Sequence, residues 1–146
     1  MTDALSPHFR LREFDCKDGT PAPAGARAAL ELWCFLWGEP LREEFGRVRI
    51  LSGYRTERWN RLQGGAASSY HVYDAIDLPW RRLRHESGVA ADVVCQRGNA
   101  QRWHEWARMH RRESRRLGGI RRGGVGFYPA QRFVHLDTGP ERSWQG

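Results

Sequence analysis

Two long stretches of the chain carry apolar residues at the spacing of an α-helix. The first runs from Ala24 to Phe45 and the second from Asn99 to Leu117. In the first stretch, Gly38 and Pro40 should break or kink the helix. The periodic positions are Ala28, Leu32, Phe35 and Leu36 in the first stretch, and Trp103, Trp106, Ala107 and His110 in the second. The spacing also predicts that four tryptophans lie in the core, namely Trp33, Trp37, Trp103 and Trp106.

Shorter runs have the alternating or continuously apolar pattern of strands. These runs are Val48–Ser52, Ala90–Cys95, Gly124–Phe127 and Arg132–Asp137. Thr56 to Gln63 reads as a short helix that begins at a capping threonine and ends at Gly64. Two long helices beside several short, hairpin-like strands predict an α+β fold, with one compact domain over residues 1–146.

Composition narrows the class of protein. The chain has 146 residues, of which 40% are hydrophobic and 12% aromatic, which excludes a disordered chain. Its mean hydropathy is −0.73, and the longest apolar run, Leu32–Trp37, is too short to span a membrane. No signal peptide follows Met1, so we expect a protein made in the cytoplasm without an export signal.

Charge and cysteine content exclude further classes. Lysine and arginine number 24 against 17 acidic residues, and the formal net charge of +7 favours polyanionic partners. No helix-turn-helix, ribonucleoprotein or zinc-finger pattern supports a specific nucleic-acid partner. The three cysteines, Cys16, Cys34 and Cys95, form no C-x-x-C pair, so we expect reduced, partly buried thiols.

Imidazoles and carboxylates occur beside glycine-rich turns and inside apolar strands. His71 follows a glycine-rich loop, and Asp92 interrupts an apolar run. His135 and Asp137 are two residues apart, so in a strand they share one face. Two histidines and an aspartate suit a zinc site with an open coordination position. A single histidine or aspartate in such a strand is more often a hydrogen-bonded structural residue, so the case for a metal site rests on the three together.

The order of motifs along the chain resembles the zinc D-alanyl-D-alanine carboxypeptidase superfamily, which includes L,D-endopeptidases and phage endolysins that cut peptidoglycan peptides. The resemblance implies a Hedgehog/D-Ala-D-Ala peptidase-like fold. It rests on motifs spread over nearly the whole chain: His8 to Thr20, Ser52-Gly53-Tyr54-Arg55-Thr56, Trp59-Asn60-Arg61, Gly64-Gly65-Ala66, Ser69-Tyr70-His71, Gly123 to Pro129, Phe133-Val134-His135-Leu136-Asp137 and Trp144.

The resemblance implies roles for individual residues. The Ser-x-His motif makes His71 a zinc ligand, Ala-x-Asp makes Asp92 the second ligand, and Val-His-x-Asp makes His135 the third. Arg55 matches the arginine that faces the substrate in the family, where it can hold a carboxylate or stabilise an oxyanion.

The first departure from the family pattern is an insertion. The family places its aspartate seven positions after the first histidine, whereas Asp92 lies 21 positions after His71, which implies about 14 inserted residues at about 74–87. His85 lies seven positions before Asp92 and is the alternative ligand, although it lacks the preceding serine. Asp77 is a weaker alternative to Asp92.

The second departure concerns the general base. Many members of the family have an acidic residue three positions before the last histidine, and this chain has Arg132 there. Asp137 could act as the base, or Glu86 could supply the carboxylate. Alternatively, Asp137 only orients His135.

The resemblance implies zinc-dependent hydrolysis of peptide bonds in peptidoglycan stem peptides by a phage or prophage enzyme. Such an enzyme would act at the cell wall, as an endolysin or as a virion component beside other phage proteins. The alternative is a catalytically weak or inactive module that keeps the fold and binds the wall. The sequence does not distinguish a carboxypeptidase from an endopeptidase.

Overall fold

The strands of the protein form one sheet. The computed structural model describes residues 2–66, 69–73, 89–97, 99–116 and 123–146. Within them the strand order is β1-β2-β4-β3-β5, and every neighbouring pair is antiparallel except β3 and β5. The α+β prediction is therefore confirmed. The strands are β1 (Val48–Ser52), β2 (Ala90–Cys95), β3 (Gly124–Tyr128), β4 (Phe133–Asp137) and β5 (Arg142–Gln145).

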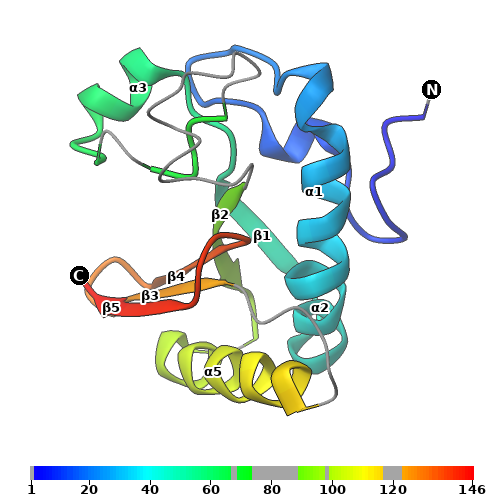
Figure 1. Cartoon of the computed structure of the whole chain (residues 1–146), viewed down its shortest axis with the longest axis vertical. Coiled ribbons are helices and arrows are strands. Elements are labelled where there is room, and N and C mark those ends of the chain that lie inside the picture. The colour runs from blue at the N-terminus through cyan, green and yellow to red at the C-terminus, as the bar shows by residue number, and fades with distance from the viewer. Residues whose placement is uncertain (1, 67–68, 74–88, 98, 117–122) are drawn as a thin grey trace.

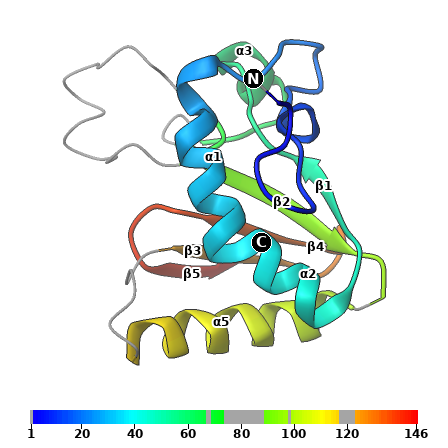
Figure 2. The same cartoon turned by 90° about the vertical axis from the view of Figure 1, so that its right-hand side faces the viewer.

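Helices pack around this sheet. One continuous helical column lies beside it, α5 lies alongside β3 and packs against it, and the strands separate α3 from α5 (Figures 1 and 2). The column consists of α1 (Arg27–Trp33), a π-helical turn (Cys34–Gly38) and α2 (Glu39–Phe45); the other helices are α3 (Glu57–Leu62) and α5 (Ala100–Arg116), with 3-10 turns at Leu11–Phe14 and Ala24–Ala26. No helix among these residues is long and apolar enough to cross a membrane.

The predicted break in the first helix is a π-helical turn, through which the helix continues. Pro40 has no backbone N–H, so the carbonyl of Leu36, four residues earlier, lacks its usual α-helical donor. The Nε2 atom of His110 lies 2.8 Å from this carbonyl oxygen and can donate to it. The proline therefore creates a contact between the first helical column and α5.

The first helix does not bury all of the residues that recur at the helical spacing. Leu32 and Phe35, which recur at the helical spacing, are 38% and 74% exposed, so this spacing does not identify the buried face. The tryptophan prediction is confirmed for Trp33 and Trp37, which are buried. Their indole nitrogens donate to the β4 carbonyls of Leu136 (2.9 Å) and Asp137 (3.1 Å), and this pair of bonds fixes the helix against β4.

Other local predictions are confirmed. Thr56 caps α3, because its Oγ1 accepts from the backbone N–H of Trp59 at 3.1 Å. In α5, Trp103 and Ala107 are buried as predicted. The three cysteines are buried thiols that form no disulfide with one another. The proposed insertion at 74–87, with His85, Glu86 and Asp77, lies outside the described residues.

Candidate metal centre

Strand pairing places two of the predicted ligands opposite each other. In the antiparallel pair of β2 and β4, Asp92 is the direct partner of His135. Directly opposed side chains on one face of such a pair are in contact range. Their neighbours Val93 and Val134 point to the other face and are fully buried in the core. The direct pairing of the two strands therefore positions both side chains toward the site.

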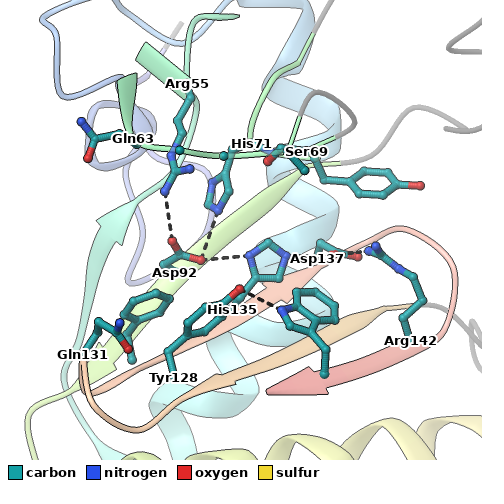
Figure 3. A pocket seen from close by; sticks show the side chains of 16 residues that line it. Arg55, Gln63, Ser69, His71, Asp92, Tyr128, Gln131, His135, Asp137 and Arg142 are labelled. Atoms are coloured by element: carbon teal, nitrogen blue, oxygen red, sulfur yellow. Dashed lines mark hydrogen bonds and ion pairs between the residues drawn. The ribbon is translucent and has the colours of Figure 1, made fainter. Parts of the chain in front are cut away.

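The third predicted ligand, His71, comes from a turn. The Oγ atom of Ser69 accepts from the backbone N–H of His71 at 3.2 Å, which explains why a serine two residues earlier suits this position. The carbonyl of His71 accepts from the backbone N–H of Arg55 at 2.7 Å. These bonds hold the histidine backbone against the segment that follows β1, so that the imidazole points at Asp92 (Figure 3).

The outer nitrogen of each imidazole faces a fixed acceptor. The Nδ1 atom of His71 lies 2.7 Å from the carbonyl oxygen of Gly53, and Nε2 of His135 lies 2.8 Å from Oδ2 of Asp137. A carbonyl and a carboxylate can only accept, so both outer nitrogens carry a proton. In the neutral imidazoles the inner nitrogens, Nε2 of His71 and Nδ1 of His135, then carry lone pairs.

Both inner nitrogens point at the same carboxylate oxygen. The Oδ1 atom of Asp92 lies 3.1 Å from Nε2 of His71 and 2.9 Å from Nδ1 of His135. Three lone-pair atoms at these separations repel one another unless a proton or a cation lies between them. Ligand atoms of the three residues all lie within 4.8 Å of one another, and two imidazoles with one carboxylate are a donor set that zinc prefers. The residues therefore fit a zinc ion.

The pKa values show that Asp92 and the two imidazoles are strongly coupled. Burial by itself raises the pKa of Asp92, but His71 and His135 hold it well below its usual range. Burial by itself lowers the pKa of His135, yet its bonds to Asp137 and Asp92 raise it to about 9. A site that favours an extra positive charge this strongly also favours a cation.

Asp137 is fully buried, and both of its oxygens are occupied. Its Oδ1 accepts from the backbone N–H groups of Gly124 (2.8 Å) and Gly139 (2.9 Å). Its Oδ2 accepts from His135 and, at 2.6 Å, from Nη2 of Arg142. Burial raises the pKa of Asp137 by itself, but these donors lower it overall. The carboxylate is thus a fixed anion that orients the His135 ring.

Arg55 lies beside Asp92 on the other side of the centre. Its side chain is 16% exposed, and each of its three nitrogens has an acceptor. These acceptors are Ser52 Oγ at 3.0 Å, Asn60 Oδ1 at 3.2 Å and Asp92 Oδ2 at 3.4 Å. The predicted residue is therefore at the centre, where it holds the second oxygen of Asp92.

The centre lies in a pocket of about 430 Å³. One wall comes from the end of α3 and the loop after it, and the other comes from β3, β4 and β5. Tyr128, Arg142 and Trp144 line the second wall, and of these Arg142 alone lies outside the motifs that carry the resemblance. The indole of Trp144 donates to the Tyr128 hydroxyl at 2.8 Å, and its ring centroid lies 5.0 Å from that of His135.

Arg132 does not lie in this pocket. It has a left-handed backbone (φ 61°) between β3 and β4 and lines a separate groove with Val94 and Phe127. The position at which many members of the family have an acidic residue therefore contributes no carboxylate to this pocket. Among the described residues that line the pocket, the carboxylates are Asp92 and Asp137.

Comparisons with known proteins agree on one family. The profile of the family described as Peptidase M15 matches residues 7–137. The chain is 59% identical, over 68% of its length, to the "Probable peptidoglycan L,D-endopeptidase MepK" of Haemophilus influenzae. It is 32% identical, over 66% of its length, to the "Peptidoglycan L,D-endopeptidase MepK" of Escherichia coli K12. The aligned region covers 43% of each relative, and no solved structure shows a significant match.

Proposed function

Because the chain belongs to the peptidase M15 family, we propose that it hydrolyses peptide bonds in peptidoglycan stem peptides with a zinc ion held by His71, Asp92 and His135. The observation that carries the proposal is the convergence of two imidazole lone pairs on one Asp92 oxygen. The substrate class comes from the relatives, whose printed names specify a peptidoglycan L,D-endopeptidase.

The chemistry divides between the metal and the chain. A bound zinc ion supplies a Lewis acid for the scissile carbonyl. Gly53 and Asp137 keep the two histidines in the tautomers that bind a metal. Arg55 holds Asp92 and places positive charge beside the centre, where an oxyanion develops during peptide hydrolysis.

The biological setting is a further part of the proposal. We propose that the enzyme acts at the cell wall for a phage or prophage, as an endolysin or as a virion component. The support is the resemblance of the sequence motifs to those of phage endolysins. The relatives named above are bacterial proteins, and they support action on the wall.

Zymography on purified cell walls tests the proposal. The wild-type protein with zinc should clear the walls, and a chelator should abolish the clearing until zinc is restored. His135→Ala should give no clearing, whereas Arg112→Gln, an exposed change on α5, should clear normally. If wild-type protein loaded with zinc binds walls but cleaves nothing, the protein is a wall-binding module, and the proposed hydrolysis is wrong.

A further inference from the structure

Arg142 lies at one end of the pocket with part of its donor capacity unused. Its side chain is 42% exposed and lines the pocket. Nη2 donates to Asp137, and Nε donates to the carbonyl of Pro140 at 3.3 Å. Among the described residues, no acceptor lies within hydrogen-bond distance of Nη1. The outer edge of the guanidinium can therefore bind an acceptor that enters the pocket.

Two aromatic rings hold this guanidinium in place. Its central carbon lies 5.1 Å from the ring centroid of Tyr70 and 5.2 Å from that of Trp144. Both rings sit against glycines, because a Cβ at Gly139 would lie 2.5 Å from Tyr70 and a Cβ at Gly126 would lie 2.6 Å from Trp144. A planar donor group held between two rings loses little freedom when it binds a carboxylate.

The other arginine of the centre is already committed. All three nitrogens of Arg55 have acceptors, and its side chain is much less exposed than that of Arg142. The carboxylates that line the pocket are also engaged, Asp92 by the histidines and Asp137 by four donors. Of these two arginines, Arg142 is thus the better placed to receive a carboxylate from a substrate.

We propose that Arg142, with Tyr70 and Trp144, forms a subsite that binds a carboxylate of the peptide substrate. This inference rests on the proposed function and specifies its substrate class: an anionic peptide with a carboxylate on one side of the scissile bond. Gln63 and Gln131 lie at the other end of the pocket, so the peptide runs between them and Arg142 (Figure 3). The carboxylate belongs either to the C-terminus or to an acidic side chain.

Three synthetic peptides of alternating L and D residues test the subsite. The first has one C-terminal and one side-chain carboxylate, and the other two each have one of these groups converted to a carboxamide. For wild-type protein with zinc, one conversion should lower kcat/KM by about 10- to 100-fold, the effect of losing a hydrogen bond to a charged group. The sensitive conversion identifies the source of the carboxylate.

The Arg142→Gln variant separates binding from positioning, because Arg142 also contacts Asp137. In a carboxylate subsite the variant should cleave the carboxylate and carboxamide peptides equally well, and Arg142→Lys should recover part of the preference. Arg112→Gln should keep the wild-type preference. Calorimetric titration of the peptides into metal-free protein should show the same loss of preference in Kd.

Three results would overturn the inference in different ways. If Arg142→Gln lowers kcat/KM for all three peptides by one common factor, Arg142 only positions Asp137, and the proposed function stands. If wild-type protein clears walls but shows no preference for either carboxylate, the subsite is again absent. If wild-type protein with zinc cleaves neither walls nor peptides, the proposed function fails, and the inference fails with it.

Discussion

The Nε2 atom of His135 lies 2.8 Å from Oδ2 of Asp137, two residues further along the same strand. Strand alternation puts the two side chains on one face, and the buried carboxylate fixes the proton on Nε2. As a result Nδ1 is the His135 nitrogen that faces Asp92. One side-chain pair thus determines which atom of the histidine is available to a metal.

Asp137→Asn should weaken both the metal site and the fold. The carboxylate accepts from four donors, two on each oxygen, and an asparagine offers only one acceptor oxygen. Each buried donor left without an acceptor costs about 1–3 kcal/mol. Zinc affinity should fall about 10- to 100-fold, as for other residues that orient a metal-ligating histidine. Zinc Kd, from competition with a chromophoric chelator, and Tm measure the two effects.

The same variant distinguishes the two roles considered for Asp137. If hydrolysis is lost while zinc Kd and Tm stay at wild-type values, Asp137 is the general base and the positioning role is wrong. Asp15→Asn is a matched control, because Asp15 is a partly buried carboxylate remote from the pocket that accepts from the backbone N–H of Ala22. It should leave zinc affinity unchanged.

His71→Ala should remove stoichiometric zinc, and His85→Ala should retain it. The imidazole of His71 lies 3.1 Å from Asp92, within the cluster that fits a metal, whereas His85 lies outside the described residues. Elemental analysis of the purified variants measures the zinc content directly. Loss of zinc from His85→Ala, with full zinc in His71→Ala, would show that the first histidine was chosen wrongly.

The sequence was informative where a ligand position follows from local periodicity. The alternation of β4 predicts the face of His135, Asp92 is a carboxylate inside an apolar run, and Ser69 belongs to the motif whose turn presents His71. The sequence was not informative where a long-range contact determines which residues are buried. Phe35 fits the helical periodicity, yet it is exposed, whereas Trp37 is buried and its indole donates to a β4 carbonyl.

Strand β5 shows a second limit of sequence reasoning. Its residues, Arg142–Gln145, lack an apolar alternation, and the strand exists because it pairs in parallel with β3. The sequence around Arg142 therefore did not indicate that this residue lines the pocket. The glycines of β3 were a usable signal, since Gly126 leaves the space that the indole of Trp144 occupies.

The stability of the metal-free protein should peak in mildly acidic solution. The folded state lowers the pKa of Asp92, so its stabilising effect is complete above about pH 4 and is lost as pH falls. It raises the pKa of His135 to about 9, so that contribution is complete below about pH 6.5 and is lost as pH rises toward 9. The Tm of chelator-treated protein should fall between pH 6.5 and 9.

The stabilisation of the fold by zinc should grow as pH rises, because the ligands bind zinc only when deprotonated. The difference in Tm between zinc-loaded and chelator-treated protein should therefore widen from pH 6.5 to 9. Thermal scans in matched buffers, with and without chelator, measure it. A metal-free Tm that rises over the same interval would contradict the assignment of the extra proton to His135.

Arg55→Lys should impair hydrolysis more than it impairs zinc binding. A lysine keeps a positive charge near Asp92 but cannot serve Ser52, Asn60 and Asp92 at once, as the guanidinium does. We expect kcat/KM to fall by about 10²-fold, as when one oxyanion donor is lost, with one zinc still bound. Arg61→Lys, an exposed change on α3, serves as the control. Unchanged hydrolysis by Arg55→Lys would exclude a role for Arg55 near the reacting carbonyl.

Gly126→Ala should displace Trp144 from the pocket wall. Gly126 pairs with His135 on one side and with Trp144 on the other, and an added Cβ would lie 2.6 Å from the indole. The indole would lose its hydrogen bond to Tyr128 and its contact with the His135 ring. Because the metal ligands keep their own partners, zinc content should stay at one per chain, while kcat/KM falls by about tenfold, comparable with losing one hydrogen bond.

A double variant tests whether Gly126 acts through Trp144. Trp144→Phe supplies a smaller ring, so the variant with both Gly126→Ala and Trp144→Phe should lose less activity than the two single losses predict. This non-additivity measures the contact between Gly126 and Trp144. Strictly additive losses would show that Gly126 acts on the site through something other than Trp144.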